Sequence, residues 1–285
     1  MAAIGNWDNS NCVLAFLPQC LEQGTNPSSF NTGNTSFLYR GPSAGGSETG
    51  DLTNMASGYG YVDGGYVKFD GTNDFIGVNN FSNTVTTSSK FTIAMRVKLN
   101  AEPTANKTVF SASNASGDLI NIFFRNLSDV LRFQVYEAAG GDNSYVDSSV
   151  DALNYGGYDV VHLVYDQGTL KLYLNGVEDS NSQDNYTGGS LAFDLLDIGR
   201  ANGGGNEWLG EMSWLVFYDD AISTDRITAD NTNADNFYGL LGYSDAPGTD
   251  EVFDSLVAPS SGITLPIISK NGIHSPVFGG QVITG

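Results

Sequence analysis

The stretch YVKFDGTNDFIGV, residues 66–78, decides the fold that the sequence predicts. Polar and apolar residues alternate as far as Asp70, which is the pattern of a β-strand with one buried face. Gly71 follows, and Asp-Gly marks a tight turn because glycine adopts a positive φ without a Cβ clash. Apolar residues resume at Phe75, so the stretch predicts a β-hairpin with a polar turn.

Alternation with a period of two continues through most of the chain. The clearest case is FTIAMRVKL, residues 91–99, in which every second side chain is apolar. Asn175-Gly176 predicts a second hairpin, because a type I′ turn needs positive φ at both central positions. Ser223 is a candidate N-cap of one short helix, and residues 137–154 are predicted to form a polar loop. Further strands are predicted at residues 12–17, 37–39, 108–113, 119–125, 130–136, 160–165, 169–174, 195–198 and 211–218.

The composition agrees with a turn-rich, all-β protein, because 35 of the 285 residues are glycine and only 15% are charged. Lys and Arg number 12 against 32 Asp and Glu, which gives a net charge of −20. Binding to phosphate backbones or anionic lipids needs cationic side chains, so we expect neither nucleic acid nor a membrane as a partner. Such an acidic surface suits a salty or Ca²⁺-rich exterior, or simply keeps the protein soluble.

The character of the chain changes after residue 243. Residues 244–285 contain four prolines and too little apolar sequence for a core of their own. We therefore predict one domain at 1–243 and an extended tail at 244–285 that anchors the protein or binds a partner. The spacing of Cys12 and Cys20 allows a disulfide without requiring one, and no Cys/His pattern predicts zinc. The sequence predicts neither a classical secretory leader nor a transmembrane helix.

Four segments, taken in their order and spacing, resemble the laminin-G-like, concanavalin A-like jelly-roll domains. They are VKFDGTNDFIGV (67–78), FTIAMRVKL (91–99), HLVYDQGTLKLYLNG (162–176) and LDIGRANGGGNEWLGEMSWLVFYDDAIS (196–223). The resemblance covers about residues 10–240. It implies an all-β jelly roll, a sandwich of two antiparallel sheets with connections at its rims.

The resemblance also implies that rim loops bind glycans or proteins, often together with Ca²⁺. Calcium binds several oxygen ligands at about 2.3–2.6 Å, and Asp70, Asn73 and Asp74 in the turn are candidate ligands. Ser213 stands where relatives commonly carry a carboxylate, which argues against the family's calcium site. The alternative is that this segment forms only a tight turn.

A glycan site is predicted on the glycine-rich loop at residues 199–210. Sugars are held by aromatic faces together with amide and carboxylate hydrogen bonds, and these groups gather there and on two other polar loops expected to reach the same rim. The alternative is that the tryptophan of the loop packs on the edge of the sandwich. The candidate glycan-binding residues are Asn202, Asn206, Glu207, Trp208, Tyr145 and Tyr186.

No catalytic array is apparent in the sequence. Glycosidases with this fold use carboxylates in an ExDxxE-like array on one strand face, and no such array occurs here. Glu178 and Asp179 are adjacent, so on a strand they face opposite ways. His162 lies in the middle of a predicted strand, and no GxSxG motif accompanies it. We therefore predict that the protein is not an enzyme.

The leaderless start, the acidic exterior and the tail together indicate a virion protein of a phage. It would be a capsid decoration, fibre or tail component on the virion surface, with a glycan-adhesion role. Its partners would be other virion proteins, contacted through residues 244–285, and cell-surface glycans, and a homo-oligomer is compatible with this role. The alternative is a secreted, Ca²⁺-dependent bacterial lectin or adhesin at the cell surface, and a third interpretation is a polysaccharide-active enzyme.

Overall fold

The computed structural model describes residues 66–79, 83–126, 129–151, 153–180 and 185–234, together with six short strands outside these ranges. Two of the six, β19 (Ile267–Ser269) and β20 (Gly272–His274), pair with each other within the predicted tail. The rest of the tail lies outside the described residues, as does Cys20. Within the described part of the chain, no helix has the length and hydropathy of a membrane span.

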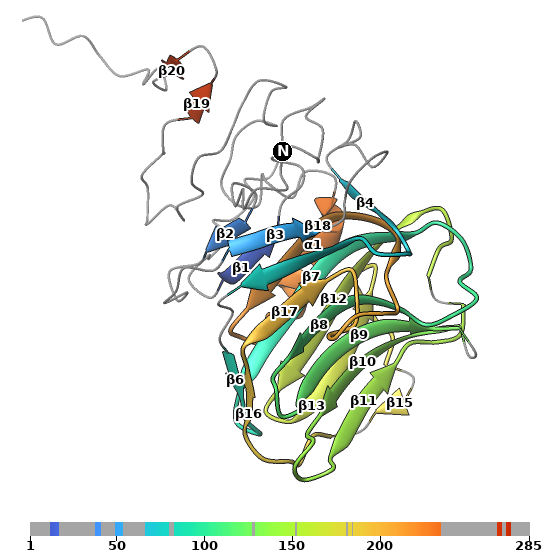
Figure 1. Ribbon diagram of the computed structural model, residues 1–285, viewed down its shortest axis with the longest axis vertical. Coiled ribbons are helices and arrows are strands. Elements are labelled where there is room, and N and C mark those ends of the chain that lie inside the picture. Colours follow the sequence, from blue (N-terminus) through green and yellow to red (C-terminus); the bar gives the residue numbers. More distant parts are fainter. Residues whose placement is uncertain are drawn as a thin grey trace, which may run out of the picture.

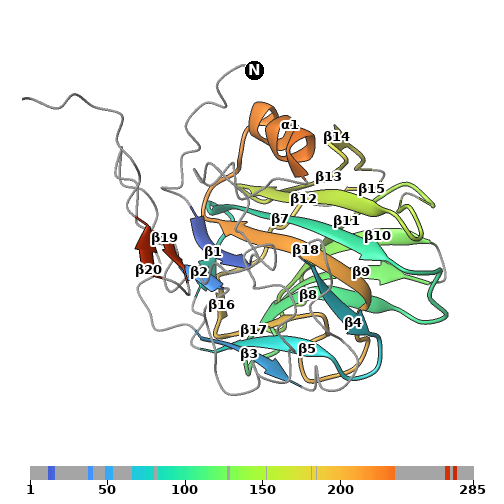
Figure 2. The ribbon, with the colours of Figure 1, turned by 90° about the horizontal axis from the view of Figure 1, so that it is seen from above.

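Two antiparallel sheets, A and B, form a sandwich, and Figure 2 shows them as two layers with α1 (Thr224–Thr232) on the outer side of sheet A. The strands of sheet A run in the order β14 (Val177–Glu178), β13 (Thr169–Leu174), β12 (Tyr158–Asp166), β7 (Lys90–Leu99), β18 (Leu209–Tyr218), β1 (Cys12–Phe16) and β2 (Leu38–Arg40), with β4 (Val67–Asp70) also on β18. The strands of sheet B run in the order β15 (Ser182–Gln183), β11 (Asn143–Asp147), β10 (Val130–Tyr136), β9 (Leu119–Arg125), β8 (Lys107–Ser113), β17 (Leu195–Ile198), β5 (Phe75–Asn79) and β3 (Thr49–Thr53). A separate pair joins β6 (Asn83–Val85) to β16 (Leu191–Phe193). This arrangement confirms the predicted all-β, two-sheet jelly-roll sandwich (Figure 1).

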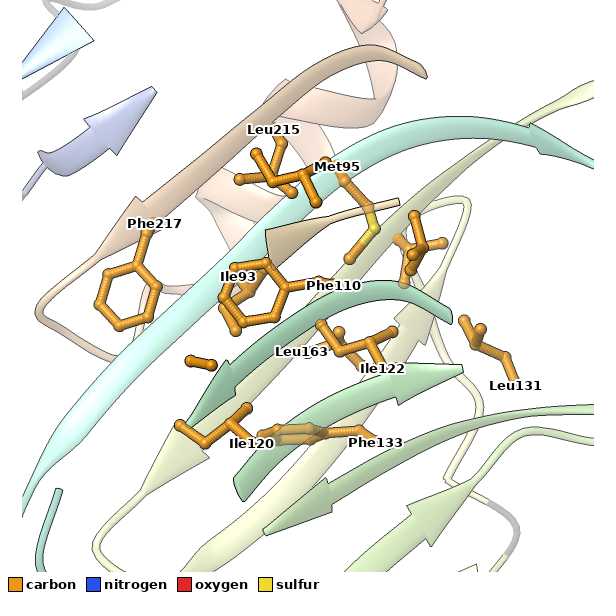
Figure 3. Close-up of a cluster of buried hydrophobic side chains, with 14 of the residues drawn as sticks. Ile93, Met95, Phe110, Ile120, Ile122, Leu131, Phe133, Leu163, Leu215 and Phe217 are labelled. Atoms are coloured by element: carbon orange, nitrogen blue, oxygen red, sulfur yellow. The ribbon is translucent and has the colours of Figure 1, made fainter. Parts of the chain in front are cut away.

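The core lies between the sheets, as Figure 3 shows for its central part. In β4, β9, β10 and β11 buried residues alternate with partly exposed ones, as the period-two pattern predicts. Phe91 organises one end of this core, because its ring stacks on Tyr165 at 4.9 Å and on Phe217 at 5.6 Å between centroids. The side chains labelled in the close-up, each at most 1% exposed, are Ile93, Met95, Leu163, Leu215 and Phe217 from sheet A and Phe110, Ile120, Ile122, Leu131 and Phe133 from sheet B.

The predicted hairpin at residues 66–78 is wrong in its pairing, although both of its strands exist. β4 pairs with β18 in sheet A, whereas β5 pairs with β17 and β3 in sheet B. The turn therefore carries the chain from one sheet to the other. Gly71 has φ +77°, and a Cβ there would lie 2.9 Å from the Cβ of Leu209, so the glycine is required by both the backbone and the packing.

The other predicted strands and the helix are confirmed within a residue or two. Ser223 caps the helix, since its Oγ accepts a hydrogen bond from the Arg226 amide. Asn175 and Gly176 both have positive φ, as a type I′ turn requires. The predicted polar loop at residues 137–154 is wrong, because it contains β11, and β3, β6 and β16 were not predicted either.

Candidate functional site

The outer side of sheet B carries an unusual set of side chains on β9, β10 and β11. Along each strand, buried core residues alternate with partly exposed residues that face away from the core. The outward set includes aromatic rings, amides and two arginines, and we call its polar and aromatic members the open face. They are Asn121, Phe123, Arg125, Arg132, Gln134, Tyr136, Asn143, Tyr145 and Asp147.

Strand register aligns four polar residues into a row across the open face. Directly paired residues in antiparallel strands place their side chains on the same face of the sheet. Each strand step is about 4.8 Å, so the row spans about 14 Å, the length of two to three sugar rings. From β11 to β8 the row contains Tyr145, Gln134, Asn121 and Ser111.

A second row holds the charged groups of the open face. Arg132 donates two hydrogen bonds to Asp147, from Nε at 2.6 Å and from Nη2 at 2.7 Å, and its guanidinium lies 3.6 Å from the centroid of the Tyr145 ring. Burial opposes the charge of Arg132, but the bonds and charge of Asp147 outweigh it, so the pKa of Arg132 lies above its ordinary value. Arg125 approaches the same carboxylate at 3.5 Å. The row therefore fixes the position of Tyr145 through a bidentate ion pair.

The amides of the open face include an acceptor that the protein itself does not satisfy. Asn121 Oδ1 is buried and has no hydrogen-bond partner, whereas Gln134 donates through Nε2 to Asn143. A buried acceptor without a partner costs free energy until a donor reaches it. A ligand hydroxyl or N–H is a donor of the kind that this position lacks.

The glycine-rich loop reaches the end of the same polar row. The Asn202 amide donates to Ser111 Oγ at 3.2 Å, which places Asn202 beside the row. Asn206 is exposed with φ +54°, and its carbonyl accepts a hydrogen bond from the Thr108 amide. Glu207 accepts from the Gly205 amide within the loop. The structure thus brings Asn202 next to the row of Tyr145, while Asn206 and Glu207 lie farther along the loop.

Trp208 and Tyr186 do not take part in this surface, and their prediction as glycan-stacking residues is wrong. Trp208 is fully buried, so it packs on the sandwich as the alternative has it, although within the core and not at the edge. Tyr186 is 2% exposed, and its hydroxyl donates to the Gly189 carbonyl.

The candidate calcium ligands lie next to the glycine-rich loop, because Asp70 pairs with Leu209. Their oxygens face the backbone of the turn: Asp70 accepts from the amides of Thr72 and Asn73, and Asp74 accepts from the Asp70 amide. Burial of Asp74 raises its pKa to about 6, an effect opposed by that amide hydrogen bond.

Two further observations bear on whether the turn fits calcium. The Lys107 ammonium donates a hydrogen bond to the Gly71 carbonyl at 3.0 Å, so one oxygen of the turn already binds a cationic side chain. Among the described residues, no three His, Cys, Asp or Glu side chains converge as a metal site. The residues present do not fit a calcium ion as they are arranged, because calcium requires several converging oxygens.

Several residues of the open face escaped the prediction of the site. Asn121, Phe123 and Gln134 lie within predicted strands, at positions that alternate with the core residues. The outward-facing positions of the period-two pattern could have identified them, although such positions usually carry ordinary charged or polar surface residues. Two aromatic residues and two amides at those positions are the departure that indicates a binding surface.

The carboxylates on the open face are not arranged for glycoside hydrolysis. Among the outward residues of β9, β10 and β11, Asp147 is the one carboxylate, and it is paired with Arg132. His162 lies in the middle of β12, as predicted, and is buried beneath α1, where its Nε2 lies 3.1 Å from Asp230 Oδ2. Neither arrangement brings an acid and a base together at the surface.

Solved structures with the same fold include toxin binding domains. The botulinum neurotoxin serotype G binding domain is similar at a TM-score of 0.57 and 10% identity, covering 79% of this chain and 51% of that chain. The botulinum neurotoxin serotype D ligand binding domain, solved in complex with N-acetylneuraminic acid, is similar at a TM-score of 0.56 and 11% identity, covering 81% of this chain and 53% of that chain. The chain therefore spans about half the length of these domains, and at such identities the likeness concerns the fold.

Comparisons of sequence give the family. No curated protein matches the chain significantly. A family model described as the concanavalin A-like lectin/glucanases superfamily, laminin G type 3, matches residues 70–228, which is more than half of the 285 residues. The match begins at the Asp-Gly turn and ends within α1, so it covers most of the strands of both sheets. The chain belongs to the concanavalin A-like lectin/glucanase superfamily.

Proposed function

We propose that the chain is a non-enzymatic glycan-binding protein and that the open face holds the glycan. The observation that carries the proposal is the row from Tyr145 through Gln134 to Asn121, flanked by Phe123. Aromatic faces bind the apolar faces of sugar rings, while amides bind their hydroxyls. The row from Tyr145 to Asn121 spans two strand steps, about 10 Å, which is about the length of a disaccharide.

Three features support binding over catalysis. Hydrolysis of a glycosidic bond needs two carboxyl groups about 5–10 Å apart across it, and the outward residues of β9, β10 and β11 include one carboxylate, Asp147. Arg132 holds that group in a bidentate pair. The serotype D domain with the same fold was solved with a bound sugar, N-acetylneuraminic acid, which favours a saccharide as the class of ligand.

Alanine substitutions at Phe123 and Tyr145 test the proposal. Each removes an aromatic ring from the open face, and we expect binding of any glycan identified on a glycan array to weaken by about tenfold or more. Tyr155→Ala is the matched control, because Tyr155 is an exposed tyrosine (38%) outside this face. Calorimetry measures the glycan affinity of each variant. Equal losses of affinity in all three variants, or no binding to any glycan, would contradict the proposal.

We further propose the virion surface as the setting, with the tail at 244–285 attaching the protein to other virion proteins. The net charge of −20 supports an exterior location over binding to nucleic acid. A chain ending at residue 243 is expected to fold and bind glycan but to be missing from purified particles. Normal incorporation of that truncated chain would remove the anchoring role. Secretion of an active lectin in the absence of any particle would favour the alternative, a bacterial lectin or adhesin.

A further inference from the structure

The chain contains three asparagine–glycine pairs, and the fold surrounds two of them very differently. Asn175-Gly176 lies in the turn between β13 and β14, and Asn202-Gly203 lies in the glycine-rich loop between β17 and β18. In the third pair, Asn271 lies outside the described residues. Asparagine is a chemically labile residue, and a following glycine makes it more so, because no Cβ shields the next backbone nitrogen.

The loss of an asparagine side-chain amide needs water and no other reagent. The backbone nitrogen of the glycine attacks Cγ of the asparagine, the new C–N bond closes a five-membered succinimide ring, and the side-chain nitrogen leaves as ammonia with the proton of the glycine N–H. Water then opens the ring, at Cγ to give aspartate or at the backbone carbonyl to give isoaspartate. One amide is hydrolysed to a carboxylate, and nothing is oxidised or reduced. The asparagine side chain must be free to turn its Cγ toward the next nitrogen.

Asn175 is exposed, yet the fold holds its side chain through both polar atoms. Its Oδ1 accepts a hydrogen bond from the Val160 amide at 2.9 Å, and its Nδ2 donates to Asp159 Oδ1 at 2.8 Å. The space beside the turn is also filled, because a Cβ added at Gly176 would lie 3.3 Å from Asn231 Nδ2 on α1. The side chain of Asn175 must therefore break two hydrogen bonds before its Cγ can turn toward the Gly176 nitrogen.

Asn202 is partly buried, yet no hydrogen bond within the described part of the chain holds its side chain. Its hydrogen bond is made by the backbone amide, which donates to Ser111 Oγ at 3.2 Å. Gly203 is exposed with φ +80°, and a Cβ added there would have nothing within 4 Å. Among the described residues, the Gly203 N–H donates no hydrogen bond either. Both reacting groups of this pair are therefore free to approach each other.

We propose that Asn202 is a site of spontaneous deamidation in the folded protein and that the fold protects Asn175 from the same reaction. Exposure alone would favour the opposite order, because Asn175 is the more exposed of the two. The hydrogen bonds of the Asn175 side chain and the open surroundings of Gly203 decide the order instead. The product at residue 202 is a carboxylate, which adds one negative charge to a chain of net charge −20.

Deamidation of Asn202 would alter the end of the candidate glycan site, a consequence that rests on the proposed function. Asn202 lies beside Ser111, which pairs with Asn121 in the polar row. An amide both donates and accepts hydrogen bonds, whereas a carboxylate only accepts them. A sugar oxygen that accepts from the Asn202 amide would lose its donor, and isoaspartate would also lengthen the backbone of the loop by one atom. The modification itself does not depend on glycan binding.

Peptide mapping by tandem mass spectrometry tests the modification directly. The full chain is incubated in warm, mildly alkaline buffer, once folded and once unfolded in urea, and the deamidated fraction of each asparagine–glycine pair is followed with time. In the folded protein we expect Asn202 to react at least about tenfold faster than Asn175, because two hydrogen bonds must break first at Asn175. In urea those hydrogen bonds are lost, and the two rates should become similar. Asn271 gives a separate peptide and does not enter the comparison.

Equal rates at Asn202 and Asn175 in the folded protein would overturn the proposal. The same holds if unfolding in urea accelerates Asn202 as much as it accelerates Asn175, because the loop would then protect its asparagine equally well. This comparison needs no variant, so its outcome does not depend on whether a substituted chain folds.

The consequence for binding is tested separately with Asn202→Gln, because glutamine keeps the amide but is too long to form the five-membered ring. Calorimetry compares the glycan affinity of each protein before and after incubation. We expect the unmodified protein to bind about fivefold more weakly after incubation, the effect of about one lost hydrogen bond, and Asn202→Gln to keep its initial affinity. Unchanged affinity in a fully deamidated sample would overturn the consequence, whereas no glycan binding before incubation would contradict the proposed function alone.

Discussion

Replacing Asp230 with alanine is expected to lower the free energy of unfolding by about 3–5 kcal/mol, the usual cost of breaking a buried ion pair from one side. Asp230 lies on α1 and is fully buried against sheet A. One carboxylate oxygen lies 3.1 Å from His162 Nε2, and the other accepts a hydrogen bond from Arg226 Nε. Because the acceptor is a carboxylate, the imidazole donates through Nε2.

The loss of Asp230 would leave the His162 side chain buried without its partner and would remove one of the contacts of Arg226. The His162 side chain is fully buried, and its other nitrogen, Nδ1, has no hydrogen-bond partner. The apolar contact of α1 with the sheet is small, because it consists of Ile227 packed on Val164 and Tyr173. We therefore expect α1 to detach, which amide hydrogen exchange at residues 224–232 would report as lost protection.

Asp225→Ala is the matched control for this prediction. Asp225 lies on the same helix, in its first turn, and is exposed. Its favourable interaction with the helix dipole is worth only about 0.3–1 kcal/mol. Chemical denaturation of both variants gives the comparison. If Asp230→Ala cost no more than Asp225→Ala, the buried contacts of Asp230 would not hold the helix in place.

The fold could be predicted from the sequence because its local signals agree with one another. Residues 91–99 alternate strictly, and Asn175-Gly176 and Ser223 have the turn and cap chemistry that the structure uses. Local signals do not predict which strands pair with each other. A strand, a turn and a strand look alike whether the strands pair with each other or enter different sheets, and the partner of β4 is β18, about 140 residues away.

The candidate site was predicted less well, because exposure depends on what packs beneath a residue. Trp208 follows exposed glycines in the loop, yet it is buried in the core. Tyr145 was predicted as a loop residue, whereas it lies on β11 and faces outward. The neighbours of Tyr145 in the polar row come from β10 and β9, and only the register of three strands brings them together. The register between strands depends on the whole sheet, so the sequence of any one segment does not predict it.

The stability of the protein is expected to depend on pH through Asp74, in the turn between β4 and β5. Asp74 is 1% exposed, and burial raises its pKa from 3.8 to about 6. A group that binds its proton more tightly in the folded state stabilises that state most below its unfolded pKa, near 3.8. This contribution is lost as the pH rises through about 6. One pKa unit corresponds to about 1.4 kcal/mol, so a pKa raised from 3.8 to about 6 means that ionised Asp74 costs the fold about 3 kcal/mol at pH 8.

Asp74→Asn removes this titration while keeping an oxygen that can accept from the Asp70 amide, the hydrogen bond that Asp74 Oδ2 makes at 2.8 Å. We expect the variant to be more stable than the unmodified protein at pH 8, by about 3 kcal/mol, and about equally stable at pH 4. Urea denaturation of both proteins at the two pH values measures the difference, and pH 4 is the internal control. A difference of the same size at both pH values would contradict a titrating Asp74. A variant less stable at pH 8 would mean that the charged carboxylate stabilises the turn, as a cation-binding site would require.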